Sequence, residues 1–372
     1  MNPLKVGIIG LKCYDHLIGA EVPRYLGGIE TQLATLAKGL VAQGCEVSLI
    51  TYDHGQPDDE IIAGVRVIKS HPPESGLPMI RAIHPRTSGL FRAMKSAAAD
   101  IYLQMGAGME TGQTAIGSRI LGRPMVFCLA SDANFGSHLS SGRWGIEGKA
   151  YRFGLKSARR IVAQTGVQRD GLRQATGLES TIIPMAVLPP SGEARRNETS
   201  RILWVGRITP GKRLDWLLEA AKRLPNFTFD IVGTPNRDSE HATQLMEEAR
   251  CLPNVVVHGR APVSILVELY AGASLLACTS ELEGFPTTFL EAWSIGLPVV
   301  TTFDPDGVVA KNELGLVAED LEDFISKLGG LLQEDATRQI LADNALKYFE
   351  ENHSVSEVCR RFGEMLEDVC QR

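Results

Sequence analysis

The sequence predicts an α/β fold made of two doubly wound, parallel-sheet domains. Apolar runs of strand length alternate with amphipathic runs of helical length from one end of the chain to the other. This alternation is typical of parallel strands joined by helices that cover both faces of a sheet. The series starts twice, because a polar stretch rich in Pro, Ser and charged residues, Pro189–Ser200, separates two such sets. The length of 372 residues also favours two hydrophobic cores over one.

The first set begins within a few residues of Met1 and ends before the polar stretch. Its predicted strands are Lys5–Ile9, Glu46–Thr51, Val65–Lys69, Ile101–Gln104, Met125–Leu129, Arg160–Ala163 and Thr181–Ile183. Its predicted helices include Ile29–Ala42, Met109–Leu121 and Gln168–Thr176.

The second set begins after the polar stretch and ends in helices. Its predicted strands are Arg201–Val205, Thr228–Val232, Val255–His258, Ser274–Ala277 and Val299–Thr301. Its predicted helices are Leu214–Arg223, Ser239–Arg250 and Val263–Ala271, and from about Leu321 the chain is helical. The last helix, Ser354–Val369, lies beyond the second set of strands.

Composition is that of a globular protein, with 44% hydrophobic and 22% charged residues. We expect no transmembrane helix and no leader, because there is no run of eighteen apolar residues and no basic region followed by a cleavage site at the N-terminus. The seven cysteines show no CxxC or Cys/His spacing, which favours reduced thiols in a cytoplasmic protein over a metal site.

Charge is divided unevenly along the chain. Residues 1–190 carry 20 Lys and Arg against 15 Asp and Glu, and residues 191–372 carry 18 against 29. A basic first half favours anionic acceptors or peripheral contact with an anionic membrane. No aromatic-rich basic platform accompanies the charge, so nucleic acid is not an expected partner. The basic helix around Trp144–Arg160 is either such a membrane contact or a solvated face.

The most informative stretch runs from Glu283 to Pro298, after the apolar run Ala273–Thr279. A proline suits the first turn of a helix, and the backbone N–H groups at that helix start can bind an anion such as a diphosphate. Carboxylates on either side of an anion site would repel the anion unless they face neutral groups of the same ligand. Sugar and ribose hydroxyls are such groups, since they can donate hydrogen bonds to a carboxylate. The candidate site residues here are Glu283, as a catalytic residue, and Phe285, Pro286, Thr287, Thr288 and Glu291, as ligand-binding residues.

A second loop, Gly206–Lys212, follows the strand Arg201–Val205 directly and opens a helix. Arg207 and Lys212 lie near glycines, where they can neutralise a diphosphate from two sides. The alternative is an ordinary solvated basic loop.

The two stretches, G-R-x-x-x-x-K and E-G-F-P-x-x-x-L-E-A, resemble in order and spacing the retaining GT-B glycosyltransferases of group 1, or family 4. The resemblance implies two Rossmann-like domains facing a cleft: an acceptor domain at 1–190, a nucleotide-sugar donor domain at 191–352, and a helix at 353–372 that crosses back onto the first. It also implies that Glu283 lies beside the donor sugar and that Glu291 holds the ribose hydroxyls. Arg207 and Lys212 would stabilise the leaving diphosphate.

Other positions are implied by the same resemblance. Gly27 and Gly28 match a loop that closes over donor phosphate and acceptor, and Gly259 with Arg260 match a loop that cradles the base.

The chain departs from the family at two places. No histidine follows Met125–Leu129, where many members have one near the donor sugar, and Asp132 is the expected substitute or else a helix cap. The usual Pro-Asn-Gly before the linker is replaced by Pro184-Met-Ala.

We therefore predict a retaining, metal-independent enzyme that uses a UDP- or GDP-sugar and no cofactor. The acceptor would be a saccharide, a lipid-linked group or a small molecule, in envelope polysaccharide or glycoconjugate synthesis, at the cytoplasmic side of the inner membrane. Asp304-Pro-Asp306 has the form of a metal-binding D-x-D but is also an ordinary turn sequence.

Two other classes of protein stay open as alternatives. One is a non-catalytic nucleotide-sugar sensor. The other is an NAD-dependent oxidoreductase with Asp53 on the ribose, although its G-x-G-x-x-G turn is missing.

Overall fold

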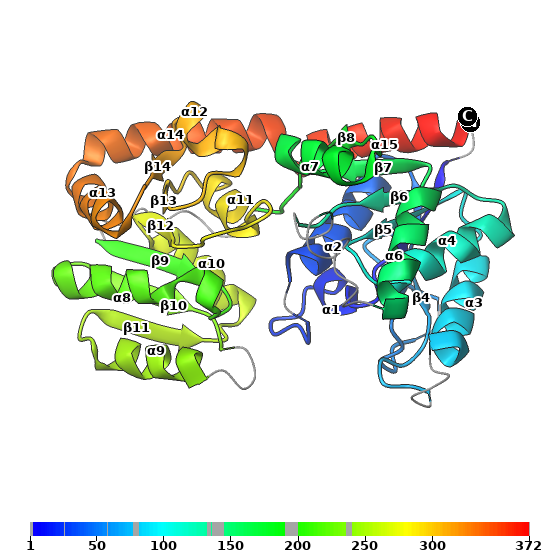
Figure 1. Cartoon of the computed structure of the whole chain (residues 1–372), viewed down its shortest axis with the longest axis horizontal. Coiled ribbons are helices and arrows are strands. Elements are labelled where there is room, and N and C mark those ends of the chain that lie inside the picture. The colour runs from blue at the N-terminus through cyan, green and yellow to red at the C-terminus, as the bar shows by residue number, and fades with distance from the viewer. Residues whose placement is uncertain are drawn as a thin grey trace. The chain divides into compact units, whose positions relative to one another are not determined.

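The computed structural model describes residues 3–25, 27–57, 59–76, 82–131, 135, 145–189, 200–235 and 240–371. The chain forms two compact units, Met1–Ala186 with Ser354–Arg372, and Val187–His353 (Figure 1). Each unit is a doubly wound sheet with helices, which confirms the predicted fold class. The polar stretch between the two sets of strands falls at 190–199, outside the described residues.

The sheet of the first unit has the order β3-β4-β2-β1-β5-β6-β7-β8. Its strands are β1 (Lys5–Ile9), β2 (Glu46–Thr51), β3 (Glu60–Ile62), β4 (Val65–Lys69), β5 (Ile101–Met105), β6 (Met125–Cys128), β7 (Arg160–Ala163) and β8 (Thr181–Ile182). Seven of these strands were predicted to within about one residue at either end. Neighbouring strands of the sheet are parallel, except that β3 is antiparallel to β4. The edge strand β3 was not predicted; it forms a hairpin with β4 through Ala63 and Gly64, both with positive φ.

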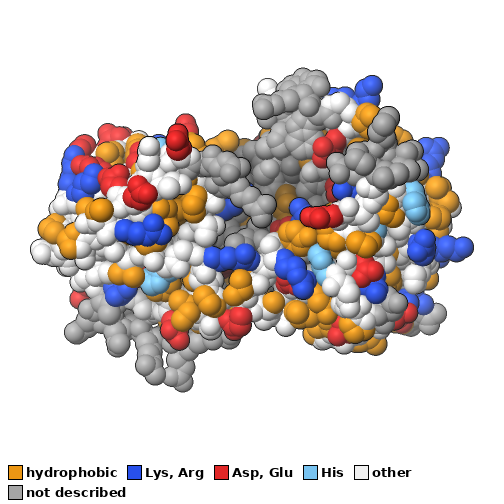
Figure 2. Space-filling model, turned by 90° about the horizontal axis from the view of Figure 1, so that it is seen from below, with side chains coloured by type: hydrophobic (Ala, Val, Ile, Leu, Met, Phe, Trp, Pro, Cys, Tyr) orange, Lys and Arg blue, Asp and Glu red, His pale blue; other side chains and the backbone are white. Residues whose placement is uncertain are grey.

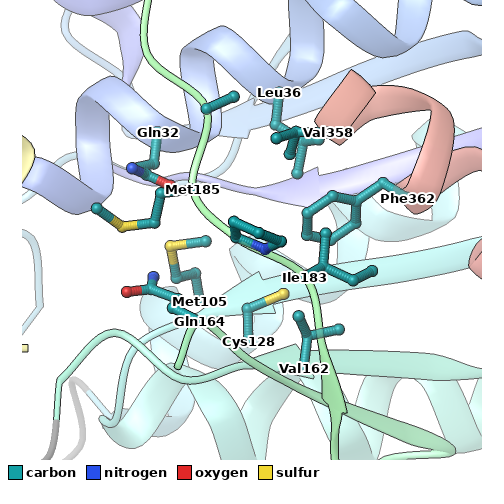
Figure 3. Close-up of a pocket in the computed structure, with 12 residues that line it drawn as sticks. Gln32, Leu36, Met105, Cys128, Val162, Gln164, Ile183, Met185, Val358 and Phe362 are labelled. Carbon is teal, nitrogen blue, oxygen red and sulfur yellow. The ribbon is translucent and has the colours of Figure 1, made fainter. Parts of the chain in front are cut away.

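The helices of this unit are α1 (Tyr14–Leu17), α2 (Gly28–Ala42), α3 (Ser88–Ala97), α4 (Met109–Leu121), α6 (Gly145–Ser157), α7 (Gly166–Thr176) and α15 (Val355–Gln371), with an irregular turn at Ala82–Thr87. The C-terminal helix α15 packs against α2, and its buried residues join the core around β1. The approach is close at Gly39, where an added Cβ would lie 2.2 Å from the Cys359 sulfur. A small pocket beneath this contact is lined by side chains that include Leu36, Cys128 and Phe362 (Figure 3).

The second unit has a sheet of order β11-β10-β9-β12-β13-β14, with every pair parallel. The strands are β9 (Arg201–Val205), β10 (Thr228–Val232), β11 (Val255–Gly259), β12 (Leu275–Cys278), β13 (Val299–Thr301) and β14 (Gly315–Val317). The helices are α8 (Leu214–Arg223), α9 (Glu240–Cys251), α10 (Val263–Gly272), α11 (Thr287–Trp293), α12 (Val308–Lys311), α13 (Leu321–Gln333) and α14 (Asp335–Asn352), with 3₁₀ turns at Pro210–Lys212 and Pro305–Gly307. Its core holds fully buried Trp204, Phe229 and Phe324.

Within the described residues, no helix is long and apolar enough to cross a membrane. On the face drawn in Figure 2, Lys and Arg side chains are scattered among acidic and hydrophobic ones over both units.

Candidate active site

The loops that carry the predicted residues of the second unit lie where its strand order reverses. The chain runs outward from β9 to β10 and β11, then returns to the other side of β9 to form β12. The loops after β9 and β12 therefore separate at the carboxyl edge of the sheet, where doubly wound folds bind their ligands. One loop holds Gly206–Arg213, and the other holds Thr279–Pro286.

The two loops are joined by an ion pair between Lys212 and Glu283. The side chains are 28% and 18% exposed, so the pair is reachable by a ligand but partly shielded from water. The sequence predicted that the lysine binds phosphate and the glutamate binds sugar. The structure pairs the two groups with each other, which places a cation and a carboxylate side by side in one site.

A buried threonine, Thr279, holds the loop that carries Lys212 in place. The Thr279 hydroxyl donates to the Lys212 carbonyl oxygen at 2.6 Å and accepts from the indole N–H of Trp204 at 3.1 Å. Because Thr279 is fully buried, water does not compete for these hydrogen bonds, and they connect the lysine loop to the core of the sheet. Backbone contact between the loops is added by the Glu281 N–H, which donates to the Gly211 carbonyl at 2.9 Å.

Arg213 ties both loops to the next strand. Its Nε donates to the Thr279 carbonyl at 2.9 Å, its Nη2 donates to the Thr302 hydroxyl at 2.9 Å, and its guanidinium lies 4.2 Å from the centre of the Trp216 ring. Arg213 has a φ of 45°, a left-handed conformation that costs free energy for a non-glycine residue. The contacts of its side chain offset that cost and hold Lys212 at the end of its short 3₁₀ turn.

Glycines let the backbones of neighbouring loops touch at this edge. Gly206 donates its N–H to Val232, and Gly233 donates to Gly259 at 2.8 Å. Gly233 has a φ of 157°, and an added Cβ would lie 1.8 Å from the Gly206 carbonyl oxygen. The base-binding glycine of the prediction, Gly259, has a φ of 64° at the end of β11.

Glu291 lies in α11, with its carboxylate against a buried tyrosine from α10. The Tyr270 hydroxyl donates to Glu291 Oε2 at 2.6 Å. Burial raises the pKa of Glu291 to about 7, although the Tyr270 hydrogen bond acts in the opposite direction. The carboxylate is therefore poised to gain from any further hydroxyl donor, because such a donor stabilises its ionised form.

The start of α11 differs slightly from the prediction. The helix is Thr287–Trp293, and Pro286 is the residue before it and not part of the first turn. The N–H groups of Thr287 and Thr288 belong to the first turn, where an α-helix offers no carbonyl partner. Phe285 anchors the loop, since its ring packs against those of Trp293 and His353, at 6.1 and 5.2 Å between centroids.

The other predicted cations lie at the surface. Arg207 and Arg260 are exposed. His258, beside the predicted Gly259, contacts the buried carboxylate of Asp230 at 2.8 Å, next to Arg201. The structure thus brings Lys212 into direct contact with Glu283, while the roles of Arg207 and Arg260 stay predictions.

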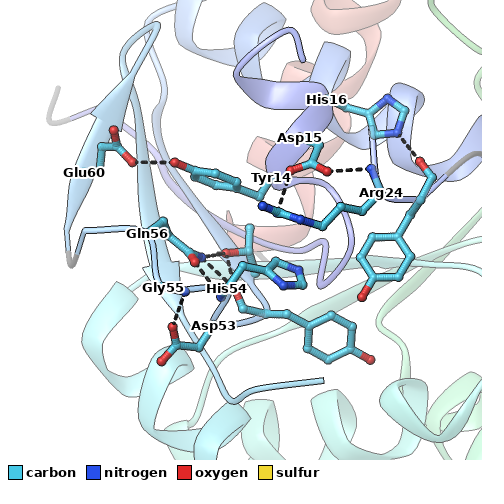
Figure 4. Close-up of polar contacts among 12 residues, drawn as sticks. Tyr14, Asp15, His16, Arg24, Asp53, His54, Gly55, Gln56 and Glu60 are labelled. Atoms are coloured by element: carbon cyan, nitrogen blue, oxygen red, sulfur yellow. Dashed lines mark hydrogen bonds and ion pairs between the residues drawn. The ribbon is translucent and has the colours of Figure 1, made fainter. Parts of the chain in front are cut away.

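The predicted Gly27 and Gly28 belong to the first unit, at the start of α2. The long loop before them is held by side chains (Figure 4). The Asp15 carboxylate accepts from the Arg24 backbone N–H at 2.6 Å and from its guanidinium at 2.8 Å, and His16 Nε2 donates to the Tyr25 carbonyl at 2.8 Å. This loop follows β1 at the reversal of strand order between β1 and β5.

Some predicted positions serve the fold or lie outside the described residues. Asp132 is one of the latter. Asp53 accepts from the Gly55 N–H at 2.9 Å, as in a turn. Asp304 caps α12, accepting from the N–H groups of Val309 and Ala310 at 2.8 and 3.1 Å. No cluster of three or more metal-ligating side chains occurs among the described residues.

Sequence reasoning missed Tyr270, Thr279 and Arg213. Arg213 follows the basic motif directly and Thr279 ends a strand at the reversal point, so both had a local signal. Tyr270 had none, because it lies 21 residues before its partner and reads as part of an ordinary apolar helix.

The two sheets, each with its reversal point, define a GT-B glycosyltransferase fold. Residues 199–334 match the family described as glycosyl transferases group 1, and residues 27–190 match the glycosyl transferase 4-like domain. The two matches together cover most of the chain, which therefore belongs to the group 1 glycosyltransferases.

Similar proteins agree on the fold and differ in substrate. The chain resembles sucrose-phosphate synthase from Thermosynechococcus elongatus, with a TM-score of 0.76, 17% identity and 98% of both chains covered. It is 28% identical over 178 residues to the UDP-N-acetylglucosamine–peptide N-acetylglucosaminyltransferase GtfA subunit of Streptococcus parasanguinis, which covers 44% of this chain and 34% of the relative. It is 28% identical over 151 residues to O-antigen chain mannosyltransferase B of Escherichia coli, which covers 39% and 40%. The matches thus span well under half of either relative.

Proposed function

We propose that this enzyme transfers a sugar, with retention of anomeric configuration and without a metal ion, from a UDP- or GDP-sugar to a hydroxyl of its acceptor. The observation that carries the proposal is the Lys212–Glu283 pair at the reversal point of the second sheet. A nucleotide-sugar presents a diphosphate next to a hydroxyl-rich ring, and this pair presents a cation next to a carboxylate.

The donor replaces the internal ion pair in this proposal. Its diphosphate takes the Lys212 ammonium, and its sugar hydroxyls donate to the Glu283 carboxylate. The ribose hydroxyls donate to Glu291, whose pKa of about 7 would then fall because the ionised form gains hydrogen bonds. The N–H groups of Thr287 and Thr288 lie in the same segment and add neutral donors for phosphate oxygens.

The reaction exchanges one bond at the anomeric carbon for another. The bond from this carbon to the diphosphate oxygen breaks, and the leaving group takes the bonding electron pair. The acceptor oxygen forms the new bond on the same face, and its proton passes to the departing phosphate oxygen. Lys212 and Arg207 stabilise the charge that grows on the diphosphate, and they act more strongly on the transition state than on the bound donor. Glu283 orients the sugar and forms no bond to it.

In this proposal the acceptor binds to the first unit and is a saccharide or a lipid-linked group. The loop after β1 and the ends of β2 and β4 bring together rings suited to stacking on a sugar. The half-buried ring of Tyr52 lies 6.4 and 6.1 Å from the half-buried rings of Tyr25 and His54, measured between centroids. The buried ring of His71 supports Tyr52 from behind, at 5.2 Å. Lys12 lies over Tyr25, at 5.6 Å from its ring centre, and would favour an anionic acceptor. A role in envelope polysaccharide or glycoconjugate synthesis, at the cytoplasmic face of a membrane, belongs to the same proposal.

The test begins with thermal-shift and calorimetric screens of UDP- and GDP-sugars, with NAD included. Donor hydrolysis and transfer are then measured for the wild type, Lys212→Ala and Glu283→Ala, with exposed Glu281→Ala as the matched control in the same loop. We expect the first two variants to lose turnover by at least about 100-fold and the control to retain it. An α-linked product from an α-linked donor, seen by NMR, supports retention.

Each other outcome would point elsewhere. Tight donor binding without turnover in the wild type, for every acceptor tried, supports a nucleotide-sugar sensor. Binding of NAD alone supports an oxidoreductase.

A further inference from the structure

The helix α6 exposes hydrophobic side chains where a surface helix would ordinarily be polar. Ile146 is 77% exposed and Phe153 is 40% exposed. Lys149, Arg152 and Lys156 are exposed on the same helix. At 100° per residue these five positions fall in one stripe about 120° wide, and the acidic Glu147 lies outside it. The exposed stripe of α6 is therefore both apolar and cationic.

The neighbouring helix α4 continues this surface. The backbones of the two helices touch at Gly112 of α4 and Gly154 of α6. Only glycine fits there, because an added Cβ would lie 2.6 Å from the Ala150 carbonyl oxygen at Gly112 and 2.5 Å from the Thr111 carbonyl oxygen at Gly154. Figure 1 shows α6 beside α4.

The outer side of α4 has the same mixture of residues as α6. Ile116 and Ile120 are 46% and 65% exposed, with Arg119 exposed between them. We call the apolar and cationic exposed side chains of both helices the α4–α6 face: Ile116, Arg119, Ile120, Ile146, Lys149, Arg152, Phe153 and Lys156.

The composition of this face selects its partner. It holds four cations and four large apolar side chains, and Glu147 is the one fully exposed acid on either helix among the described residues. A protein partner of ordinary kind would favour fewer lysines in the centre of the contact. An anionic bilayer accepts both groups at once, since isoleucine and phenylalanine enter the boundary of the acyl chains while lysine and arginine reach lipid phosphates.

We propose that the α4–α6 face docks the first unit on an anionic membrane surface. The assignment does not depend on the donor site, which lies in the second unit. Binding to vesicles is measured without donor or acceptor, so its failure and the failure of the proposed transfer reaction are distinguishable.

The experiment uses the full chain and vesicles of phosphatidylcholine, with or without one third phosphatidylglycerol, in a sedimentation assay at low and high salt. We expect binding to the anionic vesicles that weakens with salt. Lys149→Glu with Lys156→Glu should lower the partition coefficient by at least about 30-fold, since each basic residue near an anionic surface contributes about fivefold. Ile146→Ser with Phe153→Ser should lower it by about tenfold.

Matched controls come from α14, which exposes Ile340 (59%) and Lys347. Ile340→Ser with Lys347→Glu should leave vesicle binding unchanged, and circular dichroism melting of each variant should match the wild type within a few degrees. Absence of vesicle binding, equal binding to neutral vesicles, or equal losses in the α14 control would each overturn the proposal. So would a dimer in analytical ultracentrifugation that the Ile146→Ser, Phe153→Ser variant converts to monomer, because the face would then join two copies of this chain.

Discussion

Neutralising Glu283 should tighten the binding of a nucleoside diphosphate while it abolishes sugar transfer. Glu283 holds Lys212 in an ion pair, so a diphosphate without a sugar must break that pair and leave the carboxylate without its cation. Glu283→Gln keeps the size of the side chain but removes its charge. The lysine is then free to meet the phosphates.

The magnitude follows from the exposure of the pair. Two unit charges at 4 Å interact by about 4 kcal/mol at the effective dielectric constant of a protein surface. The side chains are 28% and 18% exposed, and solvent competition with side-chain entropy removes at least half of that energy. A net gain of about 1–2 kcal/mol remains, which is about 5- to 30-fold in the dissociation constant.

Isothermal titration calorimetry with UDP and GDP measures the effect. Glu281→Gln, two residues away and exposed, removes the same charge without touching the pair and should change affinity by less than about twofold. Lys212→Met should weaken binding, and adding Glu283→Gln to it should restore nothing, because the gain acts through the lysine. The reasoning is refuted if Glu283→Gln and Glu281→Gln have equal effects, or if the gain survives in the double variant.

Three further predictions concern Glu291 and two glycine contacts. Ribose hydroxyls stabilise the ionised carboxylate of Glu291, so nucleotide binding below its pKa of about 7 should release a proton, and affinity should rise with pH up to that value. Calorimetry in two buffers of different ionisation enthalpy should show this proton release in the wild type and its loss in Glu291→Gln. Gly233→Ala should cost at least about 2 kcal/mol in urea unfolding, because its Cβ would overlap a loop carbonyl oxygen at a φ of 157°, whereas Gly211→Ala, with open space around it, should stay within about 0.5 kcal/mol. Gly39→Ala should destabilise the chain by about 1–3 kcal/mol and speed proteolysis of the C-terminal helix that packs on it, while Gly363→Ala, which meets nothing within 4 Å, should stabilise by about 0.5–1 kcal/mol.

The periodic signals in the sequence determined the architecture, and two motifs in it named most of the candidate site. Strands such as β2 and β9 were located to the residue, because an apolar run between turn residues is a local property. The motif residues Lys212, Glu283 and Glu291 were named because the two stretches that hold them resemble the motifs of a known family in order and spacing. The strands β3 and β14, which have three residues each and lie at the edges of the two sheets, were not predicted; their positions depend on pairing with a neighbour.

Tertiary structure alone decided how those residues are arranged. That Lys212 meets Glu283 depends on β9 and β12 lying side by side across 71 positions of sequence, and on the Thr279 hydroxyl that supports the lysine loop. The raised pKa of Glu291 depends on burial against Tyr270, a helix earlier. The apolar and cationic α4–α6 face depends on glycines that let two helices touch. Spacing in the sequence records which groups one segment presents, whereas proximity and desolvation depend on which segments the fold brings together.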